Sequence, residues 1–317
     1  MPTLEYGKVN APAAPADIGT SGPKEGPSIR EGGIRRLHWK YCDHDEYRRR
    51  HLNALEPAIV MGAIDHWPAL NKWTPRFFRD HYGTRTVTID GMAWRLDELM
   101  ERILASSAER PAPYLRNELL AKWPAELGAD ISPMPDCTRP NYLESPLFPA
   151  RVPPTYIELY IGGAGAKFPT LHYDALHTHA FLMQIFGVKE YLAFAPDQAR
   201  FLYPRDGVEE NKSAIPDVEN PDLARFPLFR AAHGMRFLLH PGETLFIPSG
   251  WWHTARIRTT SITVSINTAG AGNWAGFRRD YCAAVACRSR LKSALLAPYM
   301  TGLGMLLSLH AQMKGIP

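Results

Sequence analysis

Three side chains in this sequence have the types and the spacing to bind one metal ion. His172 and Asp174 lie two residues apart in a run typical of a β-strand, where alternate residues face the same side. His253 lies far along the chain, beside a second such run that could bring it to the same ion. Two histidines and one carboxylate leave coordination positions open, and this ligand set is typical of non-haem Fe(II) oxygenases. Because such residues also occur as ordinary polar strand ends, the interpretation depends on their surroundings.

The elements that must position these residues are short β-strands between residues 155 and 269, separated by Gly and Pro turns. Many short strands with such turns predict a sandwich or barrel, here a double-stranded jelly roll. The fold class is therefore mainly β with flanking helices around a double-stranded β-helix core. The expected strands cover residues 156–161, 171–174, 181–186, 189–195, 235–239, 243–247, 253–258 and 261–266.

The flanking segments differ in composition from this core. Residues 1–33 are rich in Pro, Gly, Ala and Ser without an apolar period, which predicts disorder. One folded domain is expected over residues 34–273, with a helix over residues 69–82 in which Thr74 is a cap. Residues 274–317 predict two C-terminal helices.

The overall composition favours an ordinary soluble protein. Of the 317 residues, 45% are hydrophobic and 21% are charged, and the net charge is +4. No dense block of Lys and Arg is present, so nucleic acid is not the favoured ligand. The four cysteines form no CxxC pair, which argues against structural zinc and against a disulfide framework.

Nothing in the sequence predicts export or membrane insertion. The N-terminus lacks the charged start and apolar core of a secretory signal. The apolar stretch over residues 293–310 contains Pro298, Gly302 and Gly304, and is interpreted as a packed helix or a subunit contact rather than a membrane span. A cytoplasmic protein without a membrane partner is expected.

Two longer motifs enclose the three metal-binding candidates. The first is Phe-Pro-Thr-Leu-His-Tyr-Asp at 168–174, followed by Phe-Leu-Met-Gln-Ile-Phe-Gly-Val-Lys at 181–189. The second is Pro-Gly-Glu-Thr-Leu-Phe-Ile-Pro-Ser-Gly-Trp-Trp-His at 241–253. Together they resemble the JmjC-type, cupin-like 2-oxoglutarate oxygenases, and within them the branch of the asparaginyl hydroxylase that inhibits hypoxia-inducible factor. The resemblance covers most of residues 50–275.

The resemblance implies a role for several residues. The metal triad would bind Fe(II), and Lys189 would bind the distal carboxylate of 2-oxoglutarate, which Tyr114 would also hydrogen-bond. Asn267 would lie near the metal-binding end of this co-substrate. The family's threonine donor falls at Pro169 here, and Thr170 one place later is the candidate substitute. Elementary energetics agrees for Lys189, because a buried lysine without an anion is costly.

The implied activity is that of an Fe(II)- and 2-oxoglutarate-dependent dioxygenase. It would use O2 to hydroxylate an unactivated C–H bond of a protein or peptide side chain or of a small metabolite, with succinate and CO2 as co-products. Two alternatives stay open. One is a JmjC-type demethylase, and the other is a cupin hydrolase or isomerase that uses the same triad as a Lewis acid.

Some features are left open by the sequence. His177 and His179 could form a metal-binding His-x-His pair, although polar residues lining the substrate side are favoured. The loop over residues 205–232 resembles nothing that assigns it a role. The C-terminal helices correspond in position to the segment through which several relatives of the resembled family dimerise, so a homodimer is expected.

Overall fold

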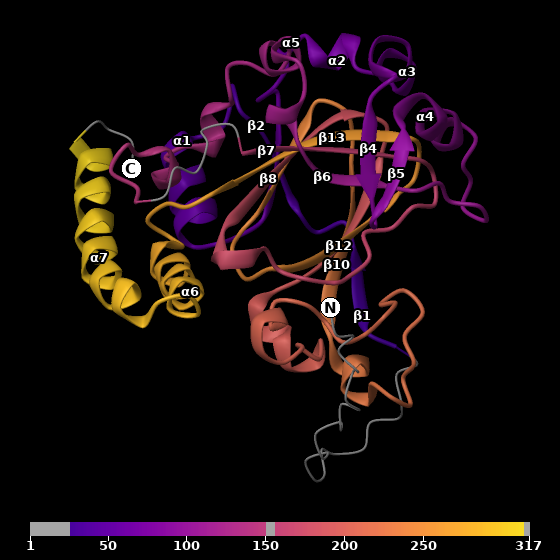
Figure 1. Ribbon diagram of the computed structural model, residues 1–317. Helices are drawn as coiled ribbons and strands as arrows, with labels where there is room; N and C mark the ends of the chain where they lie inside the picture. The colour runs from indigo at the N-terminus through magenta and orange to yellow at the C-terminus, as the bar shows by residue number, and fades with distance from the viewer. Residues whose placement is uncertain (1–25, 150–155, 314–317) are drawn as a thin grey trace.

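Two β-sheets that pack face to face form the centre of the protein (Figure 1), and the computed structural model describes residues 26–149 and 156–313. The larger sheet has the order β2 (Arg35–His38), β3 (Ala58–Met61), β11 (Glu243–Ile247), β8 (His179–Phe186), β13 (Ser261–Thr268), β7 (Ile157–Gly162) and β6 (Leu115–Leu119). The smaller sheet has the order β1 (Ser28–Glu31), β10 (His233–Leu239), β9 (Lys189–Phe194) and β12 (Trp252–Ile257). The predicted mainly β fold with a jelly-roll core is therefore confirmed.

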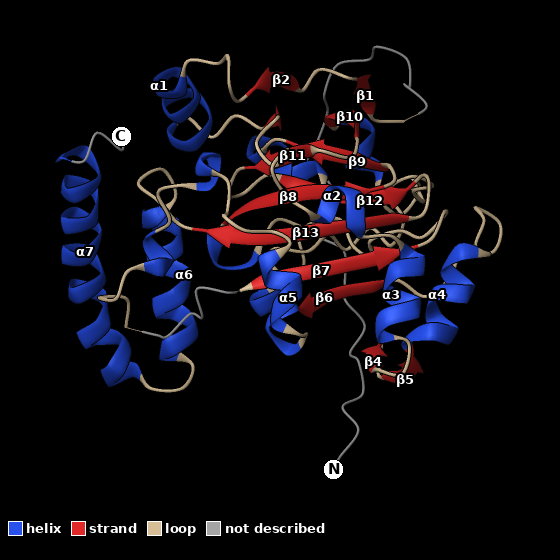
Figure 2. Ribbon diagram, turned by 90° about the horizontal axis from the view of Figure 1, so that it is seen from above, coloured by secondary structure: helices blue, strands red, loops and turns tan. Residues whose placement is uncertain are grey.

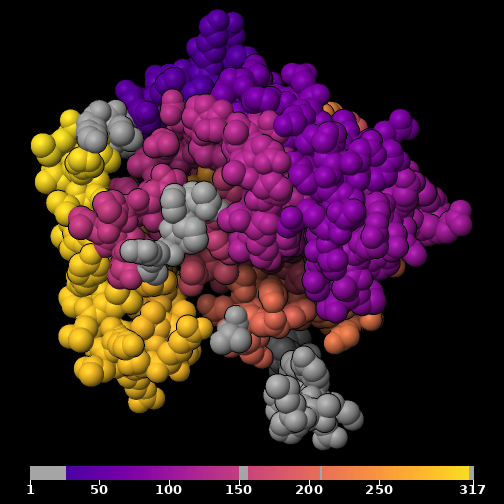
Figure 3. Space-filling view, turned by 45° about the horizontal axis from the view of Figure 1, so that its top comes forward, coloured from indigo at the N-terminus to yellow at the C-terminus, as the bar shows by residue number. Residues whose placement is uncertain are grey.

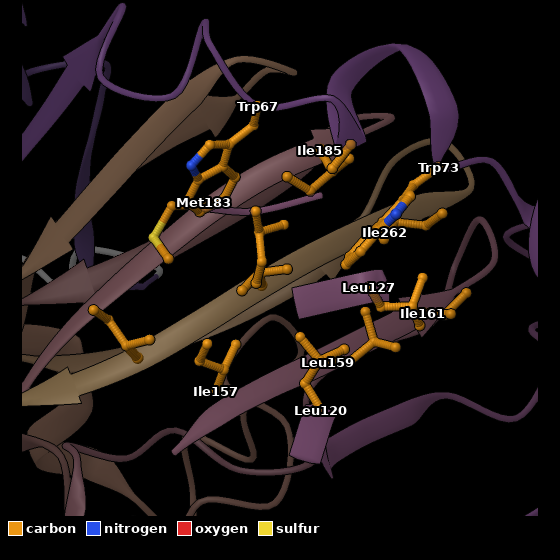
Figure 4. Packing of buried hydrophobic residues seen from close by; sticks show 14 of the residues in the cluster. Trp67, Trp73, Leu120, Leu127, Ile157, Leu159, Ile161, Met183, Ile185 and Ile262 are labelled. Atoms are coloured by element: carbon orange, nitrogen blue, oxygen red, sulfur yellow. The ribbon is translucent and has the colours of Figure 1, made fainter. Parts of the chain in front are cut away.

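Side-chain alternation along β7 separates the two faces of the larger sheet. Ile157, Leu159 and Ile161 belong to the main hydrophobic cluster outside the sheet, whereas Glu158 and Tyr160 line a cavity between the sheets. Figure 4 shows the packing of part of this outer cluster, in which the labelled residues are Trp67, Trp73, Leu120, Leu127, Ile157, Leu159, Ile161, Met183, Ile185 and Ile262. Burial of each large side chain there contributes about 1.5–3 kcal/mol, so the outer face stabilises the fold and the inner face can carry polar groups.

Short helices cover the outer cluster and flank the sheets. They are α1 (His44–Tyr47), α2 (Ala69–Lys72), α3 (Pro75–Tyr82), α4 (Leu96–Leu104) and α5 (Ala125–Ala129), with the hairpin β4 (Thr86–Ile89) and β5 (Met92–Arg95). Figure 2 shows α3, α4 and this hairpin at one end of the larger sheet, and the C-terminal helices at the other.

The helix expected over residues 69–82 is two helices, α2 and α3. Trp73 breaks it with an extended backbone, and its indole N–H donates to the carboxylate of Asp130 (2.9 Å). Pro75 favours this break, because the residue before a proline, here Thr74, is disfavoured in the helical conformation and has an extended backbone. Thr74 caps α3 as predicted, with its hydroxyl accepting from the N–H of Phe77 (3.0 Å).

The expected disorder of residues 1–33 is wrong for residues 28–31. They form β1, which pairs in parallel with β10 and extends the smaller sheet at its edge. Composition missed this strand because its hydrogen bonds go to a partner strand far along the chain. Residues 1–25 lie outside the described part of the chain.

The strand expected over residues 171–174 is also wrong as a continuous element. Only His172 makes a β-bridge, to His253 and to Lys212. The backbone turns soon after Asp174, because Leu176 and His177 adopt φ angles of 58° and 48°. His172 and Asp174 therefore lie on a short extended segment instead of a regular strand.

The segment from residue 196 to residue 232 covers the outer face of the smaller sheet. Leu202, Ile215, Phe226 and Phe229 form a hydrophobic cluster with Phe194 of β9 and other residues of that face. Lys212 of this loop also lies beside the candidate metal ligands, because it forms a β-bridge with His172. The loop whose role the sequence left open is therefore a structural cover for β9.

The C-terminal helices α6 (Trp274–Ala286) and α7 (Arg290–Met313) form an antiparallel pair beside the sheets, seen at one margin in Figure 3. The indole N–H of Trp274 donates to the carbonyl of Met300 (2.9 Å) and ties them together. By length and composition alone α7 is apolar enough to cross a membrane, and only 22% of its most apolar window is buried. Its exposed apolar side chains are Leu291, Leu295, Tyr299, Met305, Leu306, Leu309 and Met313.

The turn between β8 and β9 gives a first testable prediction. Gly187 has φ +69°, and a Cβ there would lie 1.9 Å from the carbonyl oxygen of Thr260. Gly187→Ala is therefore expected to lower the free energy of unfolding by about 2 kcal/mol or more, since strain and a backbone clash add. Gly91→Ala is the matched control, because Gly91 has φ +82° but nothing within 4 Å.

The two variants are compared by urea unfolding, from the shift of the transition midpoint. Gly91→Ala is expected to cost about 1 kcal/mol, which is the strain alone. Equal midpoints for the two variants would contradict the clash at residue 187.

Candidate metal centre and its two cavities

His172, Asp174 and His253 come together as the sequence predicts. One ligand atom from each lies within 4.8 Å of the others, and no other such group of His, Cys, Asp or Glu occurs among residues 26–149 and 156–313. Nε2 of His253 lies 3.9 Å from a carboxylate oxygen of Asp174. The imidazole rings of the two histidines are 4.5 Å apart between centroids. This is a facial set of three ligands with room left on the open side.

Backbone carbonyls orient both histidines for metal binding. Nδ1 of His172 donates to the carbonyl of Thr170 (3.0 Å), and Nδ1 of His253 donates to the carbonyl of Trp251 (3.1 Å). Each ring is thereby held in the tautomer that leaves Nε2 unprotonated for a metal. Burial, and then the neighbouring His253, lower the pKa of His172 to about 4, so this ligand is neutral at physiological pH.

Two strands and one tryptophan hold the third ligand. His253 lies on β12 opposite Ala193 of β9, and its backbone exchanges two hydrogen bonds with His172 (3.0 and 2.6 Å). Trp252, 2% exposed, points the other way and packs edge-on against Tyr173 with ring centroids 5.0 Å apart. The sheet therefore fixes the spacing of the ligands before any ion binds.

A small cavity of about 70 Å³ extends from the triad to Lys189 on β9. Lys189 is 2% exposed, and its ammonium donates to the hydroxyl of Tyr114 (2.8 Å). The rings of Tyr114 and Tyr160 each lie 5.3 Å from this ammonium. Burial lowers the pKa of Lys189 to about 7. Within the described residues no carboxylate lies within salt-bridge distance of it, and a buried cation without a counter-ion is costly unless a ligand supplies the anion.

The remaining predicted contacts lie on the other side of the metal ligands. Asn267 on β13 donates its side-chain amide to the hydroxyl of Thr178 (2.9 Å), and Thr170 offers its carbonyl to His172. Both residues line a larger cavity and not the small one. Tyr114 and Lys189 therefore lie together in the small cavity, whereas Asn267 and Thr170 line the larger cavity next to the candidate metal ligands.

This larger cavity, about 600 Å³, adjoins the small one. Five residues line both: Asn117, Glu158, Phe168, His172 and Asp174. Aromatic side chains contribute to its lining, two of them, Phe277 and Tyr281, from α6. Asn211 and Lys212 from the loop over 205–232 complete another side. The metal ligands therefore stand between a narrow inner cavity and a roomy outer one.

Glu158 is a site residue that the sequence analysis missed. It is 8% exposed and accepts hydrogen bonds from the hydroxyl of Tyr160 (2.7 Å) and the amide of Asn117 (3.3 Å). Burial raises the pKa of Glu158, and the charge of Asp174 adds to this effect. The signal was present in the sequence, because a charged residue between Ile157 and Leu159 faces the inside of the barrel.

His177 and His179 do not form a metal-binding pair. Nδ1 of His177 donates a hydrogen bond to the carboxylate of Asp280 (2.5 Å), which anchors α6 beside the site. His179 is buried, and its Nδ1 accepts from the backbone N–H of Ser249 (3.1 Å). Burial lowers the pKa of His179 to about 3. Neither is part of the group of residues that could bind a metal.

Comparison with known proteins shows the family to which this chain belongs. Residues 44–268 match the family model described as a cupin-like domain, so the chain belongs to the cupin-like family. It is 31% identical over 246 residues to lysine-specific demethylase 8 of Xenopus tropicalis, covering 74% of this chain and 52% of that protein. It is 32% identical over 238 residues to Jumonji C domain-containing protein 5 of Drosophila melanogaster, covering 70% and 56%.

A further relative has a name that points to a different role. Over 243 residues the chain is 27% identical to human tRNA wybutosine-synthesizing protein 5, covering 68% of this chain and 72% of that protein. The chain thus spans only about half the length of the first two relatives.

Proposed function

We propose that this protein is an Fe(II)- and 2-oxoglutarate-dependent oxygenase that hydroxylates an unactivated C–H bond. The observation that carries the proposal is the small cavity, with three candidate metal ligands at one end and Lys189 at the other, where no carboxylate of the described residues pairs with it. This arrangement fits a dianion that chelates a metal through one end and offers a carboxylate to a cation at the other. Fe(II) with 2-oxoglutarate and O2 would supply the oxidising chemistry, which belongs to the cofactor.

The residues of the chain then have distinct tasks. His172, Asp174 and His253 would hold the metal and leave coordination positions open for other ligands. Lys189 and Tyr114 fix the far carboxylate and so orient the co-substrate. The aromatic lining of the outer cavity limits water around the reacting carbon and orients the substrate against the metal.

The outer cavity also supports a proposal on the substrate. Its volume of about 600 Å³ suits an amino-acid side chain with part of its backbone, or a small metabolite. Glu158 offers a buried carboxylate, so a substrate with N–H donors is favoured. The name of the Xenopus tropicalis relative, lysine-specific demethylase 8, makes demethylation of lysine the second candidate. The nearness to the asparaginyl hydroxylase branch stays a prediction.

Succinate release tests the proposed function. Anaerobically purified protein is loaded with Fe(II), given 2-oxoglutarate and exposed to air, beside the same protein without iron. Iron-dependent succinate is the expected result, and candidate substrates that increase it identify the substrate class. A protein that neither forms succinate nor binds 2-oxoglutarate would favour the hydrolase or isomerase alternative instead.

Co-substrate affinity should depend on pH through Lys189. In the free protein its pKa is about 7, and a bound dianion raises this pKa because it stabilises the charged form. Below pH 7 Lys189 is already charged, so its titration does not change the affinity for 2-oxoglutarate. Above pH 7 Lys189 must take up a proton when 2-oxoglutarate binds. Affinity for 2-oxoglutarate is expected to fall about tenfold per pH unit above 7, until the pH reaches the pKa of the complex.

Calorimetry in two buffers of different ionisation enthalpy measures this proton uptake. About one proton per 2-oxoglutarate is expected at pH 8.5, and close to none at pH 6. Lys189→Met should remove the uptake at pH 8.5. Equal uptake in this variant and the wild type would assign the proton to another group.

We also propose that the protein is a cytoplasmic homodimer joined through α7. The support is the row of exposed apolar side chains on this helix, together with a groove of about 450 Å³ between α7 and residues 140–147. A patch of this kind is rarely left open to water. Gel filtration with light scattering is expected to give twice the chain mass, and a monomer at micromolar concentration would reject the dimer.

A further inference from the structure

The small cavity is also lined by a tyrosine whose hydroxyl has no hydrogen-bond partner among the described residues. Tyr191 lies on β9 two residues after Lys189, is 1% exposed, and lines the same cavity. Its hydroxyl makes no hydrogen bond within the described residues. Other buried side-chain atoms of the described residues also lack a hydrogen-bond partner. Among these atoms, only the Tyr191 hydroxyl belongs to a residue that lines the small cavity.

Packing alone gives no reason for a hydroxyl at this position. The ring of Tyr191 stacks on Phe237 of β10, with centroids 5.9 Å apart and planes 10° apart. Phenylalanine would make the same stack without burying an unpaired polar atom, which is unfavourable in a protein interior. A buried hydroxyl without a partner therefore calls for a ligand or a water molecule.

The strand register places Tyr191 between the cation and the metal ligands. Lys189 and Tyr191 occupy successive inward positions of β9. Across the ladder, Lys189 pairs with Ile257 and Tyr191 pairs with Ala255. His253 is the next inward residue of β12, so a ligand that reaches from the metal to Lys189 must pass Tyr191.

We propose that the Tyr191 hydroxyl donates a hydrogen bond to the distal carboxylate of bound 2-oxoglutarate, beside Lys189 and Tyr114. This inference rests on the proposed function. A carboxylate has about four lone-pair sites, and Lys189 and Tyr114 do not fill them. At the metal end, in contrast, the carboxylate and keto oxygens bind the ion directly. Because burial keeps the pKa of Tyr191 well above its usual value, the hydroxyl is protonated and able to donate.

The test removes the hydroxyl and the carboxylate separately. Wild type and Tyr191→Phe are loaded with Fe(II) without oxygen and titrated with 2-oxoglutarate or with 2-oxopentanoate, which lacks the distal carboxylate. The visible absorption of the 2-oxo acid chelate reports binding of both acids. Tyr191→Phe should weaken 2-oxoglutarate about ten- to a hundredfold and leave 2-oxopentanoate unchanged, as for one hydrogen bond to a charged group.

Tyr142→Phe is the matched control, because it removes another buried phenolic hydroxyl, which is bonded to Ser308 outside this cavity. It should leave both affinities unchanged. Thermal unfolding of Tyr191→Phe should occur at or above the wild-type temperature, since an unpaired polar atom is lost.

Three results would overturn the assignment. Unchanged 2-oxoglutarate affinity would show that the hydroxyl has another partner. An equal loss for both acids would place the hydroxyl at the metal-bound end. A wild-type protein that binds neither acid would reject the proposed function itself, and this result is distinguishable because it appears before any variant is compared.

Discussion

Replacing Asp174 by alanine should abolish succinate formation and weaken metal binding by more than about a hundredfold. Asp174 is the carboxylate of the triad, and its oxygen lies 3.9 Å from Nε2 of His253. Loss of a residue that only supports a metal ligand typically costs 10–100-fold, so loss of a ligand itself should cost more. Two histidines would remain, without the negative charge that offsets the ion.

The fold should survive this substitution. The side chain of Asp174 is one-fifth exposed, and it does not cap the helical turn that follows it. We therefore expect the free energy of unfolding of the metal-free protein to change by no more than about 1 kcal/mol. Asp197→Ala is a suitable control, because Asp197 is an exposed carboxylate whose side chain contacts Gln198.

Iron binding, succinate release and thermal unfolding are measured on both variants. Asp197→Ala should behave as the wild type in all three. Succinate formation by Asp174→Ala at saturating iron would reject the triad as the metal site.

The sequence predicted the elements whose pattern is local. β11 covers Glu243–Ile247 as expected, and β9 ends one residue early, because alternating apolar residues between Gly and Pro turns define a strand without help from other segments. The triad was predictable for the same reason. His172 and Asp174 are separated by one residue, and His253 follows a Pro-Ser-Gly turn that ends one strand and begins the next.

Features that depend on distant partners were not predictable. β1 forms only because β10 leaves an edge to which Ser28–Glu31 can bond. Lys212 reaches His172 only because the loop before it packs on β9. The local pattern of these segments is that of loops, and tertiary contacts decide their structure.

The inner polar residues were missed for a different reason. Glu158 and Tyr191 lie in strands that are buried on both faces, so their burial pattern does not alternate. That these side chains line one cavity becomes visible only when β7, β9 and β12 are placed around it. A charged or hydroxyl-bearing residue within a fully buried strand is thus the signal to search for.

Replacing Lys189 by alanine should weaken 2-oxoglutarate binding by roughly 2–5 kcal/mol, the usual loss when one partner of a buried charge pair is removed. This corresponds to about thirty- to several-thousand-fold in affinity. The effect should exceed that of Tyr114→Phe, because Tyr114 supplies a neutral hydrogen bond and Lys189 supplies the only cation that the described residues place in the small cavity.

Weakened binding by a Lys189 variant cannot be attributed to a damaged fold. In the described part of the ligand-free protein no counter-ion pairs with the buried Lys189, so an apolar residue of similar length should keep or raise the unfolding temperature. Lys189→Met provides this comparison, and Lys167→Ala removes a half-exposed lysine paired with Asp217 and Glu219 instead.

Affinities are measured by calorimetry at pH 6.5, where Lys189 is charged. If Lys189→Met bound 2-oxoglutarate as tightly as the wild type, another cation would hold the distal carboxylate. A loss confined to 2-oxoglutarate, with metal affinity unchanged, would instead show that the two ends of the cavity act separately.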